Sequence, residues 1–411
     1  MTPSQPVLFR AAFYIAFGAA VSILLSIAVS QILLGLALAA LLFSGAKLRL
    51  PPIWLPLVLF MAGTLIALAL ADHPAAGLPQ IKKFYVFLML PVVYSTIRDR
   101  VSVRWLFLSW GAVGAGTAVW GVVQFVHKMG QARTLGKNFY EYYTSERITG
   151  AMSHWMTFGG EEMFALLMLA AYLLFGAERS FRRLWPWFLC AGLLLAALVL
   201  GETRSIWLAT LAAGLYLIWA WKRWVVGLIP ALLALAVFAG PPSVKDRAFS
   251  FFKPRKEIDS NEFRLVTWRT GLRMIEKHPW FGIGPDGPSV EFNDYVPADI
   301  ARPLPAGFYG HLHNIYLQYA ADRGIPTMLL MVWLLLKVLF DFWRALRKLP
   351  PGPADERFVL RGATAVVIAT MVAGFFEYNL GDSEVLTMFL VAIACGYTAV
   401  APPERNGAAV G

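Results

Sequence analysis

One short polar segment, His311-Leu312-His313-Asn314, stands where a long polar stretch gives way to an apolar run. A histidine in such a place can be neutral at pH 7 and accept a proton from a hydroxyl group, which is the work of a general base. Tyr316 and Gln318 follow closely and could orient a ligand hydroxyl, so they, His311 and Asn314 are candidate supporting residues. The alternative is a histidine that a lipid headgroup or a backbone carbonyl satisfies.

Arg204 lies in a polar break, Gly201-Glu202-Thr203-Arg204-Ser205, between two strongly apolar runs. An arginine this close to hydrocarbon costs about 3 kcal/mol at mid-membrane and less near the interface, so we expect Glu202 or a bound phosphate as its partner. Arginine suits a diphosphate because its planar fork donates two parallel hydrogen bonds. Glu161 and Glu162 are also expected to pair with arginines. The alternative for Arg204 is a plain short loop.

The composition around these residues is that of a membrane protein. Of the 411 residues, 58% are hydrophobic and only 15% are charged, far below the roughly 25% that is usual in soluble domains. The apolar runs are about 20 residues long, and every backbone amide in a bilayer must be bonded internally, so the spans are helices. The predicted fold class is an all-α polytopic membrane protein.

Twelve apolar runs predict about twelve transmembrane helices. We expect helices 1–9 in residues 1–240, a large outer loop in 241–312, helices 10–12 in 313–402, and a cytoplasmic tail in 403–411. The runs lie at about 9–28, 30–45, 52–71, 84–97, 104–126, 156–176, 184–200, 205–221, 224–240, 315–342, 358–376 and 383–401. Cys190 and Cys395 both fall inside such runs, where they suggest packing and neither a disulfide nor a metal site.

The net charge of +11 is explained first by topology and not by nucleic acid. Every second connection is rich in lysine and arginine, which places those connections and both termini in the cytoplasm. Some basic residues lie in connections that this assignment places outside and are exceptions to the rule. Any single exception can be explained, because long loops tolerate charge and the side chains of terminal lysines reach the lipid headgroups. Together, however, the exceptions predict a basic outer cavity for an anionic substrate such as a diphosphate. The exceptions are Lys82, Lys83, Lys128, Arg133, Lys137, Arg147, Arg204, Lys253, Arg255, Lys256, Arg264, Arg269 and Arg273.

The outer loop is predicted to contain a surface helix at about 260–277. Asp259-Ser260-Asn261-Glu262 has the form of a capping box, and apolar residues then recur at helical spacing until Pro279. Arg264 and Trp268 are four residues apart and share a face, so a guanidinium can lie over a cavity with an aromatic ring beside it.

These features resemble the O-antigen ligase/polymerase superfamily of Gram-negative inner membranes, and within it the O-antigen ligases. The resemblance covers nearly the whole chain in its twelve-span layout, including the large loop before the tenth span. The motifs that carry it are Arg264 with Trp268, the turn Pro279-Trp280-Phe281-Gly282-Ile283-Gly284, and His313-Asn314 followed by Gly324-Ile325.

The resemblance implies a glycosyltransferase with a periplasmic site and no metal or other cofactor. Its donor would be an O-antigen polysaccharide on undecaprenyl diphosphate, its acceptor the core oligosaccharide of lipid A, and its only other partners membrane lipids, with no nucleic acid. His313 would be the general base. Arg204, Arg264 and Arg147 would hold the diphosphate, and Lys82 and Lys83 are assigned to the same donor-binding set.

The chemistry of the residues agrees with this. Cleavage between the anomeric carbon and phosphate adds negative charge to the leaving diphosphate, which preorganised arginines stabilise. A single base on the opposite face inverts the anomeric configuration. Two alternatives remain open: a polymerase or protein-glycosylating ligase of the same superfamily, and a transporter or flippase of a lipid-linked sugar. Transport predicts internal repeats, interrupted helices and charges near the midplane, whereas the polar residues here gather at the outer rim.

Overall fold

The computed structural model describes residues 7–253 and 261–400, and in these ranges its regular structure is helical without a β-strand. The predicted all-α class is therefore confirmed. In chain order the helices are α1 (Val7–Ser22), α2 (Ile27–Phe43), α3 (Trp54–Ala69), α4 (Pro74–Lys82), α5 (Phe84–Phe87), α6 (Met89–Thr96), α7 (Arg100–Thr134), α8 (Phe139–Ser145), α9 (Trp155–Phe175), α10 (Phe181–Leu200), α11 (Arg204–Trp221), η1 (Arg223–Leu228), α12 (Ile229–Ala239), α13 (Pro242–Phe249), α14 (Asn261–Lys277), α15 (Gly287–Tyr295), α16 (Ile315–Lys348), α17 (Asp355–Ala373), η2 (Asn379–Gly381) and α18 (Ser383–Val400).

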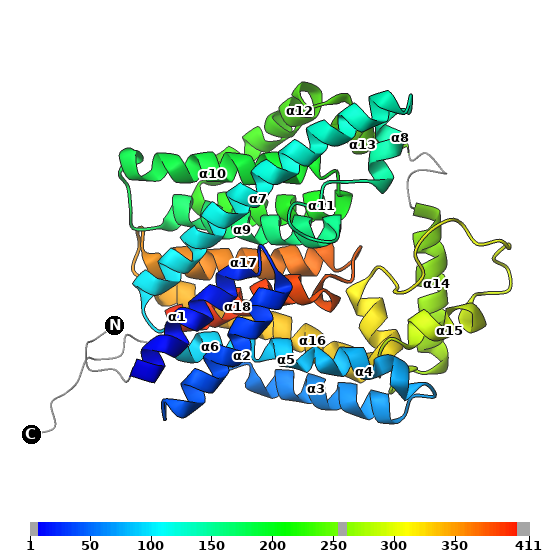
Figure 1. The fold of residues 1–411 in the computed structure, drawn as a ribbon, viewed down its shortest axis with the longest axis horizontal. Helices are drawn as coiled ribbons and strands as arrows, with labels where there is room; N and C mark the ends of the chain where they lie inside the picture. Colours follow the sequence, from blue (N-terminus) through cyan, green and yellow to red (C-terminus); the bar gives the residue numbers. More distant parts are fainter. Residues whose placement is uncertain (1–6, 254–260, 401–411) are drawn as a thin grey trace, which may run out of the picture.

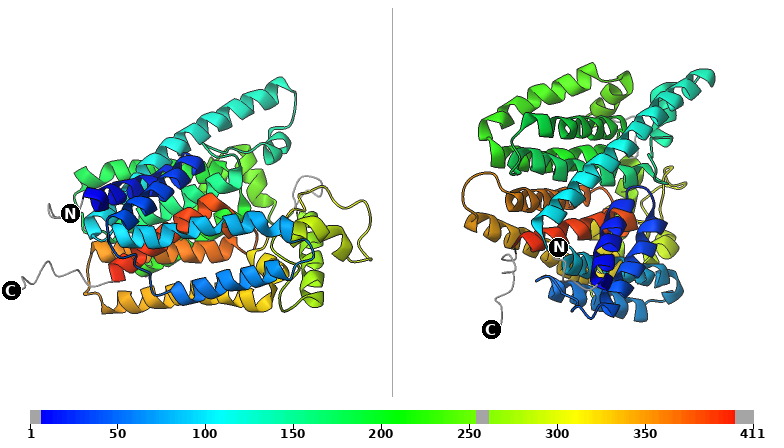
Figure 2. Two further views of the ribbon diagram at one scale, coloured as in Figure 1. Left: turned by 60° about the horizontal axis from the view of Figure 1, so that its bottom comes forward. Right: turned by 60° about the vertical axis from the view of Figure 1, so that its left-hand side comes forward.

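The long helices lie side by side in one bundle, and α14 and α15 cap one of its ends (Figure 1). Helices α9 and α18 are buried along almost their whole length and form the centre, with α17 packed against both. The start of α1 lies at the end of the bundle away from α14 (Figure 2). We call the capped end the α14 end and the other the α1 end.

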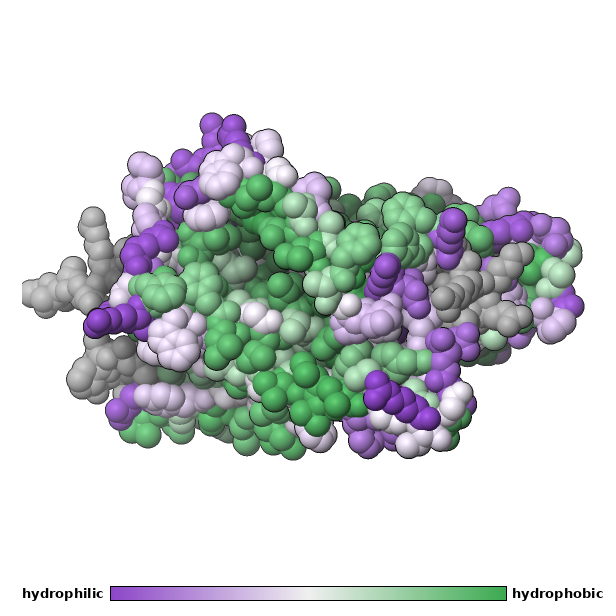
Figure 3. All heavy atoms as spheres, turned by 90° about the horizontal axis from the view of Figure 1, so that it is seen from above, coloured by the Kyte–Doolittle hydropathy of each residue, from purple (hydrophilic) through white to green (hydrophobic). Residues whose placement is uncertain are grey.

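The surface has the pattern of a protein that crosses a bilayer. An apolar band covers the middle of the bundle in Figure 3, and hydrophilic residues gather toward its two ends. Six helical stretches in the described residues are long and apolar enough to span a membrane, and shorter apolar helices accompany them. The six are Pro74–Thr96, Arg100–Thr134, Trp155–Phe175, Phe181–Leu200, Ile315–Lys348 and Ser383–Val400. The chain is a multi-pass membrane protein.

Each of the twelve predicted apolar runs coincides with a helix or with consecutive helices, although several differ in detail. The fourth run begins ten residues earlier than predicted, because α4 leads directly into α5 and α6. The ninth is a 3-10 segment followed by the short helix α12. The tenth, α16, is broken at Gly324, whose φ of 81° and ψ of 160° are not helical.

The connections predicted to share the outer side of the membrane do meet at one end of the bundle. Gln80, on α4, donates from Nε2 to Oδ1 of Asp286 beside α15 (2.7 Å). Lys83 donates from Nζ to the carbonyl of Gly381 in the connection before α18 (2.6 Å). Contacts between these sequence-distant loops place them together at the α14 end.

The connections predicted to be cytoplasmic meet at the α1 end. Arg104 of α7 contacts Asp355 at the start of α17 (3.2 Å), and Arg100 contacts Glu356 (2.5 Å). The alternation inferred from charge therefore matches the alternation of the helices. The predicted helix at 260–277 is present as α14, whereas its predicted capping residues Asp259 and Ser260 lie outside the described residues.

The break in α16 is held by the turn that follows α14. The amide of Gly284 donates to the carbonyl of Asp322 (3.0 Å), and that of Ile325 donates to the carbonyl of Pro279 (2.8 Å). Backbone groups that the break releases from helical pairing are thus bonded within the protein, as burial requires. The glycine-rich turn noted in the sequence is therefore a clip that fixes the outer loop to the start of α16.

Replacement of Gly324 by alanine should destabilise this clip strongly. A Cβ atom there would lie 2.0 Å from the carbonyl oxygen of Trp280, and the positive φ alone costs a non-glycine residue about 1–3 kcal/mol. The thermal unfolding temperature in detergent should fall clearly. Gly116→Ala is the matched control, since a Cβ there meets nothing within 4 Å on helix α7 and should be neutral or slightly stabilising. Equal effects of the two substitutions would contradict the clip.

Candidate functional site

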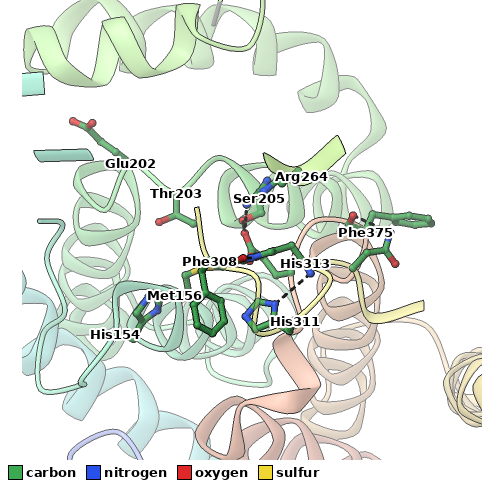
Figure 4. Close-up of polar contacts among 12 residues, drawn as sticks. His154, Met156, Glu202, Thr203, Ser205, Arg264, Phe308, His311, His313 and Phe375 are labelled. Carbon is green, nitrogen blue, oxygen red and sulfur yellow. Dashed lines mark hydrogen bonds and ion pairs between the residues drawn. The ribbon is translucent and has the colours of Figure 1, made fainter. Parts of the chain in front are cut away.

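Glu377, in the connection after α17, joins the predicted histidine to one of the predicted arginines. Its Oε1 accepts hydrogen bonds from Oγ of Ser205 at the start of α11 (3.0 Å) and from Nη2 of Arg264 on α14 (2.8 Å). Its Oε2 lies 3.8 Å from Nδ1 of His313, just before α16. Ser205, Arg264 and His313 converge from three elements (Figure 4). The carboxylate is 3% exposed, so the site is enclosed by protein.

The carboxylate of Glu377 is held in its ionised form. Burial pushes its pKa upward, but the charge of Arg264 and the contacts with His313 and Ser205 outweigh this and hold the pKa below its usual value. A stable negative charge therefore sits between a guanidinium and an imidazole.

His313 has a constrained backbone and a nearly closed surround. Its φ of 49° is in the left-handed region, which is uncommon for a residue with a side chain. The ring packs edge-on against Phe263 of α14, and Nε2 lies 3.1 Å from the carbonyl oxygen of Phe308. Because a carbonyl oxygen only accepts, Nε2 carries a hydrogen in this arrangement. Nδ1 faces Glu377 without a hydrogen bond.

His311 packs directly beside His313. The two ring centroids are 4.1 Å apart, and Nδ1 of His311 accepts a hydrogen bond from the backbone amide of His313 (3.3 Å). Burial, and secondarily the neighbouring His313, lower the pKa of His311 to about 3. This ring is therefore neutral at physiological pH and serves as an acceptor for the backbone of its neighbour.

The lowered pKa of His311 predicts a loss of stability on mild acidification. The unfolded chain binds a proton at this histidine below about pH 6.5, whereas the folded chain does so only near pH 3. Between these values the unfolded state binds more protons, so stability falls as the pH falls. The unfolding temperature of His311→Asn should decline less between pH 7 and pH 5 than that of the wild type. His127→Asn, at an exposed position, should behave as the wild type does.

Asn314, Tyr316 and Gln318 hold the histidine segment in place and make their hydrogen bonds with the chain itself. Oδ1 of Asn314 accepts from the amides of Tyr316 and the next residue, which caps α16, and Nδ2 donates to the carbonyl of Phe375 (3.1 Å). Oε1 of Gln318 accepts from the amide of Leu312 (2.7 Å). Their place is behind the site, where they fix the backbone on both sides of His313.

Arg264 and Arg204 are connected through Ser205 and Glu377. Nε of Arg264 is buried without a hydrogen-bond partner, so this guanidinium retains donors beyond the one that contacts Glu377. Nη1 of Arg204 donates to the carbonyl and hydroxyl oxygens of Ser250 (3.1 and 3.2 Å). Both predicted arginines therefore lie at the α14 end, on adjoining elements.

Arg147 belongs to a buried group with Glu202 and Arg247. Nε of Arg247 donates to the backbone carbonyl of Glu202 (2.9 Å), and the guanidinium of Arg147 lies over the ring of Trp155 (5.4 Å). Burial, then repulsion by Arg247, lowers the pKa of Arg147 to about 9, so it remains charged at neutral pH. Burial raises the pKa of Glu202 to about 7. The expected pairing of Glu202 with Arg204 is wrong, because both carboxylate oxygens of Glu202 lack hydrogen-bond partners among the described residues.

The other predicted residues are placed differently. Lys82 is exposed on α4, whereas Lys83 donates to the carbonyl of Gly381 and so joins two loops at the α14 end. Trp268 lies on α14 one turn beyond Arg264, and its indole nitrogen is buried without a partner. The predicted pairing of Glu161 and Glu162 with arginines is wrong for the described residues: Glu162 accepts from a threonine of α7, and Glu161 forms no ion pair.

Glu377 and Ser205 were not among the predicted site residues. A signal was present in the sequence, because the topology places the short polar connection 377–382 on the same side as His313. What the sequence could not show is that this connection folds against α11 and α14. Only the tertiary contacts reveal the carboxylate as the shared partner of a serine, an arginine and a histidine.

Comparison with known proteins finds a similarity in the segment that contains Arg204, Arg264 and His313. Residues 189–332 match the family model Wzy_C, described as O-antigen ligase, and the match spans α10 to the middle of α16 with Arg204, Arg264 and His313. No curated protein matches the chain. The family implies a glycosyltransferase-like ligase or polymerase activity on lipid-linked polysaccharide. The matched segment is about a third of the chain and carries Arg204, Arg264 and His313 of the site, so this part of the all-helical membrane protein is similar to the O-antigen ligases.

Proposed function

We propose that the protein is an O-antigen ligase of the Gram-negative inner membrane. It transfers O-antigen polysaccharide from undecaprenyl diphosphate to the core oligosaccharide of lipid A, with the α14 end in the periplasm and both termini in the cytoplasm. The observation that carries this proposal is the convergence of His313 and Arg264 on the buried carboxylate of Glu377. The proposed base, His313, and the proposed phosphate-binding residue, Arg264, therefore both contact the same buried carboxylate.

His313 serves as the general base. The carbonyl oxygen of Phe308 lies 3.1 Å from Nε2. When the loop that carries Phe308 moves aside, the hydroxyl group of the acceptor takes the place of this oxygen. The neutral ring then takes the tautomer that carries its hydrogen on Nδ1, directed toward Glu377, so that Nε2 is free to accept the hydroxyl proton. The anionic carboxylate stabilises the imidazolium that forms, as the third member of a catalytic triad does.

The arginines act on the leaving group. The hydroxyl oxygen forms a bond to the anomeric carbon, the bond from that carbon to the phosphate oxygen breaks, and undecaprenyl diphosphate leaves with an additional negative charge. Arg264, and Arg204 and Arg147 on adjoining elements, supply positive charge in a site shielded from water. Attack from the face opposite the leaving group inverts the anomeric configuration.

Arg264→Gln should weaken use of the lipid diphosphate. Loss of one hydrogen bond to a charged group costs about 1.5–3 kcal/mol, which corresponds to about a 10- to 100-fold rise in the dissociation constant for undecaprenyl diphosphate. Arg269→Gln is the matched control on the same helix, because Arg269 is half exposed and paired with Asp299. Equal affinities of the two variants for undecaprenyl diphosphate would exclude Arg264 as a phosphate ligand.

A transporter of lipid-linked sugar is the rival from another class, and the broken helix α16 is the feature that favours it. In transporters the freed backbone groups line a substrate path. Here amides of the turn after α14 bind the carbonyls at the break, and Asp322 and Arg323 form a buried ion pair with each other (3.0 Å). The backbone groups at the break are therefore bonded within the protein and do not line a path for substrate, which favours the enzyme over the transporter.

A strain that lacks its own ligase but makes lipid-linked O-antigen tests the proposal. Expression of this chain should restore O-antigen on lipid A-core at the cell surface. Longer lipid-linked polysaccharide without attachment to lipid A would favour a polymerase, and sugar on a protein would favour a protein-glycosylating ligase.

A further inference from the structure

A cavity of about 210 Å³ lies next to the proposed base. Glu377, His311, His154 and Met156 form part of its wall, and Figure 4 shows His154 and Met156 near His311. The cavity is smaller than the clefts of roughly 300–1,000 Å³ that hold drug-sized ligands, so it suits a single ring. The catalytic roles proposed above do not use it.

The wall contains both polar and apolar side chains. Polar side chains come from the connection before α18 and from the residue that caps α9, namely Asn379, Asp382 and His154. Apolar side chains come from α9, α11 and α18, namely Met163, Ile206 and Val385. A sugar ring has the same mixed character, since hydroxyl groups surround its edge and C–H groups cover its faces.

The charges of the wall select against an anion. Oδ1 of Asp382 accepts from the amide of Glu384, and Oδ2 accepts from the hydroxyl of Thr157. Each carboxylate oxygen has a second acceptor site, so Asp382 can still take hydrogen bonds from a ligand. Oε2 of Glu377 is buried and accepts no hydrogen bond. Two acceptor groups of negative charge repel phosphate and attract hydroxyl donors.

Arg264 contacts Oε1 of Glu377, whereas Asp382, five residues further along the same connection, lines the cavity. The guanidinium and the carboxylate of Asp382 thus belong to different parts of the site.

We propose that this cavity binds one uncharged sugar ring directly beside the reacting bond, through its hydroxyl groups and with Asp382 as the main acceptor. The inference rests on the proposed function. It divides the site in two: arginines hold the diphosphate, and the carboxylates of the cavity hold a sugar. The ring belongs either to the acceptor core or to the first sugar of the donor, and the two substrates can be tested separately.

Asp382→Asn tests the acceptor role, because the amide oxygen can keep the cap of α18 while the charge is lost. We expect KM to rise by about 10- to 100-fold for one substrate, as for loss of a hydrogen bond from a charged group. The substrates are lipid A-core varied at saturating donor, and undecaprenyl diphosphate with one sugar varied at saturating acceptor. A rise for the first assigns the cavity to the acceptor, and a rise for the second to the donor.

Met156→Trp places a larger side chain in the wall of the same cavity and gives an independent variant should Asp382→Asn fail to fold. Asp299→Asn, an exposed aspartate of the outer loop, is the control and should match the wild type. A binding readout complements the kinetics: the delipidated core oligosaccharide, or the donor, should raise the unfolding temperature of the wild type and not of Met156→Trp.

If both Asp382→Asn and Met156→Trp had unchanged KM values for both substrates, the proposed sugar site would be overturned. The proposed ligase function would still stand if the wild type transferred sugar. If instead the wild type transferred no sugar, the proposed function would fail, and the thermal shifts alone would decide whether the cavity binds sugar.

Discussion

His313→Asn is expected to lower the rate of transfer by about 10²–10⁴-fold, the usual contribution of a general base. Asparagine is the suitable replacement because it tolerates the left-handed backbone that His313 adopts (φ 49°), whereas alanine would add strain. Rates of transfer from undecaprenyl diphosphate to lipid A-core, measured at saturating substrates with purified protein, provide the test.

The variant should remain folded, because the hydrogen bonds that fix this segment come from Asn314 and Gln318. Its unfolding temperature is the check, and His127→Asn, at an exposed position of α7, is the control for loss of an imidazole. A folded His313→Asn variant with a wild-type rate would remove the histidine from the mechanism.

Glu377→Gln should lower the rate of transfer about as much as His313→Asn does, and it should also lower the stability of the fold. Glutamine keeps the shape and can still accept from Ser205, but it leaves Arg264 without its negative partner. Removal of one partner of a buried ion pair costs about 3–5 kcal/mol of stability. Loss of the carboxylate behind a catalytic histidine lowers kcat by up to about 10⁴-fold. Measured kcat and unfolding temperature should therefore fall together.

The pH dependence separates this role from simple packing. Because the folded pKa of Glu377 is below its unfolded value of about 4.5, its ionisation contributes stability that is present above that pH and is lost as the pH falls through the folded pKa. The gap in stability between the wild type and Glu377→Gln should therefore close on acidification below pH 4.5. A constant gap from pH 7 to pH 3 would mean that the charge is unimportant. Glu377→Asp should restore part of the activity.

The helical class and the alternation of the connections could be predicted because they depend on local properties. Apolar length marks a helix, and lysine and arginine mark one side of the membrane. The contacts of Gln80 with Asp286 and of Arg104 with Asp355 show that the loops group at the two ends as the charges indicate. The predicted helix carrying Arg264 is likewise present, because its periodicity is a local signal.

The break in α16 and the role of Glu377 could not be derived in the same way. An apolar run that continues past Gly324 predicts one helix. The interruption is stable only because the turn after α14 forms hydrogen bonds with the backbone on both sides of the break. Glu377 gains its importance from Ser205 and Arg264, which are 172 and 113 positions away in the sequence. Of the two partners expected for Arg204, Glu202 or a bound phosphate, Glu202 is wrong, because neighbours along the chain need not pair in space.

Reconstitution of the purified chain with undecaprenyl diphosphate-linked polysaccharide and lipid A-core, without ATP or added metal, tests the central claim most directly. An inverting ligase predicts polysaccharide covalently attached to the core, release of undecaprenyl diphosphate, and an anomeric configuration at the new bond opposite to that in the donor. Intact donor after prolonged incubation with folded protein, or a retained configuration, would contradict it.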